Sequence, residues 1–109
     1  MNVRPATAAD VDALAALEAD LFGPDAWSHA SVGAEVAAGR VLVAEDEGIA
    51  GYVVTLAAGD VLDLMRIAVR PGRRRTGLAG ALLGAASTGR RMLLEVSERN
   101  AGAVAFYAA

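Results

Sequence analysis

The stretch that most constrains the fold is residues 67–83, which read I-A-V-R-P-G-R-R-R-T-G-L-A-G-A-L-L. An apolar strand is followed by a proline-glycine break, three arginines and a glycine-rich entry into a helix with a leucine-lined face. Unpaired N–H groups and the positive end of the dipole at such a helix start favour a phosphate group, and an arginine adds a bidentate grip. The stretch therefore predicts a strand, an anion-binding loop and a helix, in that order.

Two widespread phosphate loops do not match this stretch. A Walker loop needs Lys and Ser/Thr directly after its second glycine, whereas Gly72 and Gly77 are followed by Leu78 and Ala79. The run from Gly77 to Gly80 also lacks the G-x-G-x-x-G spacing of a dinucleotide fingerprint. An arginine-rich helix start can also be no more than a solvated cap, so the rest of the chain has to decide between the two interpretations.

The length and composition limit the possible classes. A chain of 109 residues predicts a single domain spanning residues 1–109. Hydrophobic residues make up 55% of it, but the uncharged runs are too short for a membrane span, and no secretory signal opens the chain. The absence of cysteine and the single histidine, His29, argue against a disulfide, a thiolate nucleophile or a metal site. We therefore expect a cytoplasmic protein without a membrane partner or a metal.

The charge pattern argues against a general nucleic-acid partner. All ten basic residues are arginine, and thirteen acidic residues leave a net charge of -3. The basic cluster Arg73, Arg74 and Arg75 is too compact for a duplex footprint, and a single polyphosphate ligand suits it better.

Hydrophobic periodicity and turn residues predict nine elements. The expected strands are residues 2–4, 41–45, 49–56, 61–69 and 92–96, and the expected helices are residues 7–22, 28–39, 76–86 and 100–107. Thr7 with Asp10 forms a predicted capping box, and Ser28 is the predicted cap of the second helix. Trp27, between the first two helices, is either a packing residue or one wall of a substrate groove.

Three motifs carry a resemblance to one enzyme family. Arg74, Gly77 and Ala79 match the pattern Arg/Gln-x-x-Gly-x-Gly/Ala of the acyl-CoA pyrophosphate loop in GNAT N-acetyltransferases. Residues 94–107, L-E-V-S-E-R-N-A-G-A-V-A-F-Y, resemble the L-E-V-x-x-x-N-x-x-A-x-x-x-Y block of RimI-type ribosomal-protein-alanine acetyltransferases. Residues 26–28, A-W-S, resemble the P-W-S turn of the same enzymes.

The resemblance implies an α/β (α+β) chain with the GNAT acyl-CoA N-acyltransferase fold, a mixed and mostly antiparallel sheet flanked by helices. Members of the family continue after the tyrosine into two further strands, which this sequence lacks. In the family those strands complete the sheet and help to form the wall of the acceptor groove, so neither the acceptor nor full activity follows from the resemblance. An uncovered strand at residues 92–96 would favour self-association or a weakly stable final helix.

By resemblance the cosubstrate is acetyl-CoA. Its pantetheine would pair with the strand backbone, its pyrophosphate would lie in the loop, and an amide side chain would contact it from the last helix. The residues concerned are Ile67, Ala68, Val69, Arg74, Arg75, Thr76, Gly77, Leu78, Ala79, Gly80 and Asn100. Asn100 can equally be the cap of the last helix.

Two residues are candidates for the chemistry. Glu95 is a carboxylate in an otherwise apolar strand and could collect the proton of the attacking amine. Tyr107 has a hydroxyl that could protonate the leaving thiolate. Their structural alternatives are an exposed or ion-paired strand glutamate and a core tyrosine.

Together these features predict an acetyl-CoA-dependent N-acetyltransferase that acts on a protein N-terminal α-amine, with an Ala-initiated ribosomal protein as acceptor. Two rivals remain open at this point. One is a GNAT enzyme for a small-molecule amine or amino acid, and the other is a catalytically silent acyl-CoA-binding module.

Overall fold

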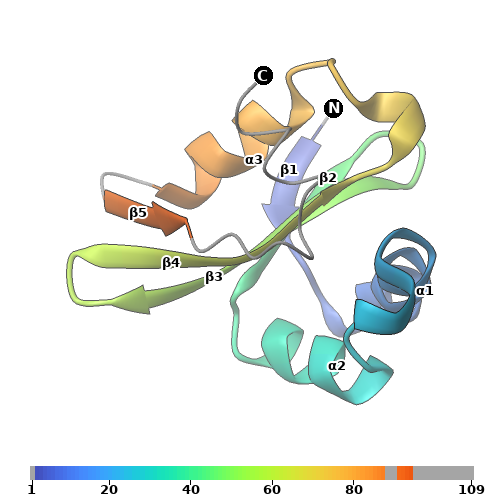
Figure 1. Ribbon diagram of the computed structural model, residues 1–109, viewed down its shortest axis with the longest axis horizontal. Helices are drawn as coiled ribbons and strands as arrows, with labels where there is room; N and C mark the ends of the chain where they lie inside the picture. Colours follow the sequence, from blue (N-terminus) through green and yellow to red (C-terminus); the bar gives the residue numbers. More distant parts are fainter. Residues whose placement is uncertain (1, 88–90, 95–109) are drawn as a thin grey trace.

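The computed structural model describes residues 2–87 and 91–94. Within them the strands and helices follow the predicted order (Figure 1). The elements are β1 (Asn2–Pro5), η1 (Ala8–Asp10), α1 (Val11–Phe22), η2 (Gly23–Asp25), α2 (His29–Ala37), β2 (Val41–Glu45), β3 (Ile49–Ala58), β4 (Val61–Val69), η3 (Pro71–Arg73), α3 (Leu78–Ser87) and β5 (Arg91–Leu94). The predicted final helix, residues 100–107, lies outside the described residues. In the part described, no helix has both the length and the apolar character needed to cross a bilayer.

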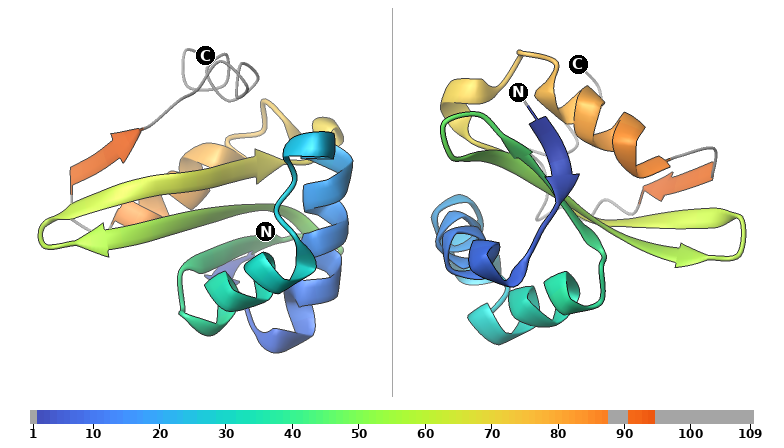
Figure 2. Two further views of the ribbon diagram at one scale, coloured as in Figure 1. Left: turned by 60° about the horizontal axis from the view of Figure 1, so that its bottom comes forward. Right: turned by 180° about the vertical axis from the view of Figure 1, so that it is seen from behind.

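The strands form one sheet in the order β1-β2-β3-β4-β5. The first four pair antiparallel with their neighbours, and β5 pairs parallel with β4. Helices α1 and α2 lie on one face of the sheet and α3 lies on the other (Figures 1 and 2). The predicted fold class, a mixed and mostly antiparallel sheet flanked by helices, is confirmed.

Strand β3 lies between two hydrophobic clusters, one on each face of the sheet. Tyr52 and Val54 pack with Leu17 on the side of α1 and α2, while Val53 packs with Leu82 on the side of α3. This alternation is the period of two expected for a strand. Because both faces of β3 are buried from Ile49 to Val54, its register against β4 is fixed over that part of the strand.

Helix α2 begins where the sequence predicts, directly after Ser28, whereas the first predicted helix starts as the 3-10 helix η1 after Thr7 and is α-helical only from Val11. Thr7 and Asp10 form the capping box, with the Thr7 N–H donating to the Asp10 carboxylate at 2.7 Å. Arg4 donates to the same carboxylate at 2.8 Å and lowers the pKa of Asp10 well below its usual value. Ser28 accepts a hydrogen bond from the Ser31 N–H at 3.1 Å and starts α2. These local contacts fix the backbone where the chain leaves β1 for η1 and where it enters α2.

Helix α3 begins later than predicted. The expected start was residue 76, but the first helical residue is Leu78. Arg75 and Gly77 have φ angles of 64° and 79°, in the left-handed region, which a right-handed helix excludes. The two left-handed residues keep the end of the loop out of the helix.

Strand β3 is two residues longer than predicted and ends at Ala58 rather than residue 56. Its pairing with β4 continues to Ala58 and Val61, and Gly59 makes the turn with a φ of 64°. Strand β5 begins at Arg91, one residue before the predicted start. The last two residues of that predicted strand, 95 and 96, are outside the described part.

Gly51 allows α3 and β4 to approach β3 closely. A Cβ at this position would lie 2.6 Å from the backbone oxygen of Ala68 and 2.9 Å from Cδ2 of Leu78. Both contacts are far shorter than van der Waals distance, so only glycine fits without displacement. This close packing sets the position of the start of α3 relative to the end of β4.

Candidate functional site

Strand β4 changes its neighbours at a bulge. Thr55 pairs with Leu64 and Val54 pairs with Arg66, so Met65 is an extra residue in β4. The parallel pairing with β5 runs only from Val61 to Leu64. Among the described residues, the outer edge of β4 therefore has no strand partner beyond the bulge. Its N–H and C=O groups can pair with an extended ligand there, as with an added strand.

The predicted strand residues Ile67, Ala68 and Val69 lie on this stretch of β4. Their side chains are 8%, 6% and 5% exposed and belong to the core, while their inner edge pairs with β3. A ligand along β4 can therefore contact these three residues only through their backbone. Backbone pairing with a ligand is the mode that the resemblance implies for them, and it stays a prediction.

The loop after β4 ends in exposed backbone with open space beside its glycines. The first helical hydrogen bond of α3 runs from the Ala81 N–H to the Gly77 oxygen at 3.0 Å, so the preceding amides come before the ladder. The left-handed backbone at Arg75 and Gly77 directs successive N–H groups in the manner of an anion-binding nest. A Cβ on Gly77 or Gly80 would meet no atom within 4 Å. The loop thus has both the donors and the space that a phosphate group needs.

The three loop arginines have different roles. Arg73 forms an ion pair with Asp46 at the tip of the β2–β3 hairpin and also donates to its backbone oxygen at 3.3 Å. This arginine lowers the pKa of the Asp46 carboxyl. Arg74 and Arg75 are exposed and form no ion pair within residues 2–87 and 91–94. Two positive charges are therefore available beside the open amides, while Arg73 fastens the loop to the hairpin.

The predicted site residues in the first turn of α3 divide between core and surface. Leu78 and Ala79 are each 3% exposed and pack on the sheet, so they can offer a ligand only their backbone. Gly80 is exposed on the opposite side of the turn, and Thr76 donates its hydroxyl to the Arg73 oxygen at 2.6 Å. Residues 74–80 thus form one surface, which begins where β4 ends.

Comparisons with known proteins identify the family to which the chain belongs. A family model described as Acetyltransferase (GNAT) domain matches residues 37–109, more than half of the chain. The chain belongs to the GNAT acetyltransferase family. A search of curated proteins gave no match.

Solved GNAT structures share the fold. The ribosomal-protein-S18-alanine N-acetyltransferase of Escherichia coli is 25% identical with a TM-score of 0.76, over 98% of this chain and 74% of that one. Diaminobutyrate acetyltransferase EctA of Paenibacillus lautus, in complex with its substrate and coenzyme A, is 24% identical with a TM-score of 0.80, over 98% and 72%. Ard1 of Thermoplasma volcanium is 20% identical with a TM-score of 0.77, over 98% and 78%.

This GNAT chain is an acetyl-CoA-dependent N-acetyltransferase. Its described residues fit the cosubstrate, because the loop offers open amides, two available arginines and space at Gly80, and β4 offers a free backbone edge. The predicted residues Glu95, Asn100 and Tyr107 lie outside the described part, so their roles stay predictions. The predicted self-association also involves residues outside it and stays a prediction.

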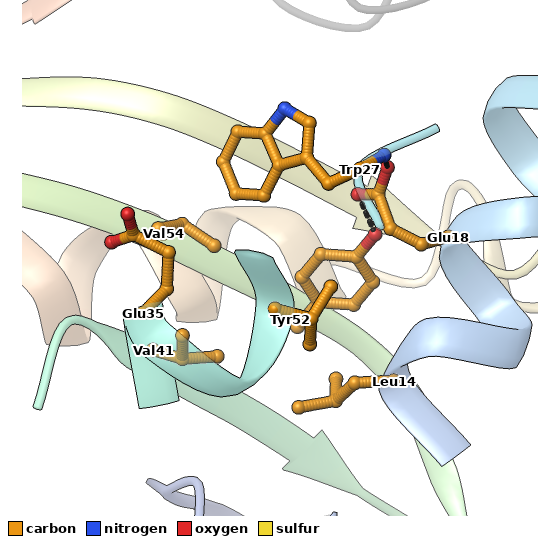
Figure 3. A pocket seen from close by; sticks show the side chains of 8 residues that line it. Leu14, Glu18, Trp27, Glu35, Val41, Tyr52 and Val54 are labelled. Atoms are coloured by element: carbon orange, nitrogen blue, oxygen red, sulfur yellow. Dashed lines mark hydrogen bonds between the residues drawn. The ribbon is translucent and has the colours of Figure 1, made fainter. Parts of the chain in front are cut away.

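One buried cluster was absent from the sequence prediction. Tyr52 of β3 and Arg66 of β4 both donate hydrogen bonds to the Glu18 carboxylate of α1, on the side of the sheet that α1 and α2 cover. Glu18 follows Leu14 by four residues and therefore shares its buried helix face, which is a signal that the sequence contains. Trp27 packs against the same core and lines a small hollow beside Glu18 and Tyr52 (Figure 3). The packing role predicted for Trp27 is confirmed, and its role as a groove wall is taken up below.

Proposed function

We propose that this enzyme acetylates the N-terminal α-amine of a protein and that its acceptor is an Ala-initiated ribosomal protein. The observation that carries the proposal is the similarity to the Escherichia coli S18-alanine enzyme over 98% of this chain. The RimI-like block at residues 94–107 and the A-W-S turn at residues 26–28 support the same acceptor class.

The cosubstrate would be held by two parts of the chain. The open amides at the start of α3, with Arg74 and Arg75, would bind the pyrophosphate. The outer backbone edge of residues 66–69 would pair with the pantetheine amides, and Asn100 would add a contact from its amide. When bound, acetyl-CoA supplies an acetyl thioester that an amine can attack directly.

The chain's own acid and base would move the protons. An α-amino group has a pKa of about 8, so a carboxylate acting directly or through water can take its proton near neutral pH. We assign that role to Glu95. We assign to the Tyr107 hydroxyl the donation of a proton to the leaving sulfur. Neither step needs a covalent intermediate on the enzyme.

A thiol-release assay with acetyl-CoA tests the acceptor class. Three acceptors are compared: a peptide that begins with alanine, the same peptide with a blocked N-terminus, and L-2,4-diaminobutyrate. We expect release with the free peptide alone.

Release with diaminobutyrate but not with the peptide would overturn the proposal in favour of a small-amine enzyme, an acceptor that the TM-score of 0.80 to EctA makes the strongest rival. Thermal stabilisation by acetyl-CoA without release on any amine would instead indicate a binding module.

A further inference from the structure

Glu18 is a buried carboxylate whose hydrogen bonds join α1 to three other segments. It is 0% exposed, and it accepts from the Tyr52 hydroxyl at 2.5 Å and from Arg66 at 2.7 and 3.0 Å. It also accepts from the backbone N–H of Trp27 at 2.8 Å. Figure 3 shows the Glu18 carboxylate between the Tyr52 hydroxyl and the start of the Trp27 side chain. We refer to Glu18, Tyr52 and Arg66 as the Glu18 cluster.

Arg66 connects this cluster to residues 23–28, the segment between α1 and α2. Its guanidinium lies over the ring of Phe22, 3.8 Å from the centroid, and 4.6 Å from the centroid of Trp27. It also donates to the backbone oxygen of Asp25 at 2.9 Å. Both ends of the segment and its middle are therefore attached to one side chain of β4.

Stability does not explain such a cluster. Apolar residues of similar volume often replace a buried ion pair without loss of stability, whereas the removal of one partner is strongly destabilising. What the charged version adds is direction, because a planar guanidinium and a carboxylate fix the distance and the angle of the elements that they join. Burial and the neighbouring Glu18 carboxylate also raise the pKa of Tyr52, so its hydroxyl remains a donor at physiological pH.

The cluster lies where the reaction is expected. A ligand anchored at the loop and paired along β4 from residue 70 reaches the bulge at Met65 after about 17 Å, at 3.3–3.4 Å for each residue. Arg66 is the first residue after this bulge, and its side chain extends to the side of α1 and α2. An acceptor that approaches the bulge from that side passes residues 23–28.

We propose that the Glu18 cluster positions the acceptor, by holding residues 23–28 and the Trp27 side chain against β4 as one wall of the acceptor site. The proposal rests on the acetyltransferase function given above and adds three positioning residues to it. They act through the wall and do not touch the reacting atoms. A shift of the wall by about 1 Å is enough to misplace the amine, an effect that can reach about a hundred-fold in rate.

The test compares three variants. Glu18→Met with Arg66→Met removes both charges together and keeps the packing volume, so the protein is expected to fold. Arg66→Lys keeps the charge but loses the paired bonds and the ring stacking, and it serves as a second test if the double variant is unstable. Glu35→Gln with Arg40→Gln is the control, since it removes an ion pair of 2.5 Å at the far end of the same hollow (Figure 3).

Two readouts separate this proposal from the proposed function. With the Ala-initiated peptide, the double variant and Arg66→Lys should lower kcat/KM for the acceptor by about ten-fold to a hundred-fold and leave the calorimetric Kd for acetyl-CoA within two-fold. Trp27 is the single tryptophan of the chain, so acrylamide quenching of its fluorescence follows the wall without any acceptor. Quenching should increase in both variants and not in the control.

Unchanged quenching in a folded variant would show that the Glu18 cluster does not hold residues 23–28 and Trp27 against β4, whatever the acceptor is. An unchanged kcat/KM for the acceptor, or an equal loss of affinity for acetyl-CoA, would overturn the positioning role. If the wild-type enzyme does not acetylate the peptide, the proposed acceptor is wrong. The quenching of Trp27 fluorescence then still decides whether the Glu18 cluster holds residues 23–28 in place.

Discussion

The anion-binding role of α3 can be tested with a substitution that strengthens the helix while it blocks the ligand. Gly80 is the third residue of α3, is exposed, and has open space around the position of a Cβ. Replacing glycine in a helix by a better helix former adds about 0.5–1 kcal/mol of stability. A carboxylate in the first turn adds about 0.3–1 kcal/mol through the helix dipole. Gly80→Glu is therefore expected to raise the free energy of unfolding.

The same carboxylate should repel the pyrophosphate. Two unit charges about 6 Å apart interact by roughly 3 kcal/mol at an effective dielectric constant of 20. That energy corresponds to an increase of about a hundred-fold in the Kd for acetyl-CoA. The variant would then be more stable than the wild type and almost unable to bind its cosubstrate, which general damage to the fold cannot produce.

Gly84→Glu is the matched control. Gly84 is also exposed, has open space around it, and lies about one turn further along α3, roughly 6 Å from Gly80 along the helix axis. Its carboxylate would be more than a Debye length from the loop and largely screened. Titration calorimetry with acetyl-CoA and thermal unfolding of both variants give the comparison. If Gly80→Glu binds acetyl-CoA as tightly as Gly84→Glu does, the pyrophosphate does not lie at the start of α3.

Three further outcomes are expected. Gly51→Ala places a Cβ 2.6 Å from a backbone oxygen of β4, so it should lower the free energy of unfolding by about 1–3 kcal/mol and weaken acetyl-CoA binding. A variant that unfolds and binds acetyl-CoA as the wild type does would contradict the close packing. Asp10→Asn should lower the free energy of unfolding at pH 7. Because Arg4 lowers the folded-state pKa of Asp10, the difference in unfolding free energy from wild type should shrink as the pH falls from about 5 toward 2. Denaturant unfolding at several pH values measures this difference, and a difference that stays constant with pH would refute the reasoning. Glu95→Gln should reduce turnover most below the amine pKa of about 8 and recover in part at higher pH, and wild-type turnover across the pH range would remove Glu95 from the mechanism.

The strands were predictable because their signals are local. Two apolar runs with the turn residues of positions 46–48 between them mark β2 and β3, and the structure places the turn there. The start of α3 was predicted two residues early because Gly77, inside the predicted helix, and Arg75, directly before it, adopt left-handed backbone. That conformation costs an arginine roughly 1–2 kcal/mol, and no residue type in the loop announces it. Only the packing around the loop determines it.

The Glu18 cluster shows a different limit. The position of Glu18 on the buried face of α1 can be read from its spacing to Leu14, so a buried carboxylate was predictable. Its partners were not, because Tyr52 and Arg66 are 34 and 48 residues away in the sequence. Period and propensity describe neighbours along the chain, and they contain no information on which distant cation meets which buried acid.

This difference separates the two halves of the site. Most of the cofactor half, in our proposal, is backbone from one contiguous stretch, residues 66–80, so its requirement for small residues is visible in the sequence. The acceptor half, on the same proposal, is positioned by side chains from α1, β3, β4 and the segment between α1 and α2. Substitutions there can move the wall without a change in the loop. One fold can therefore serve different acceptors, as in the S18-alanine enzyme and the diaminobutyrate enzyme, which share this fold. The acceptor must then be sought in the geometry of residues 23–28 rather than in the loop motif.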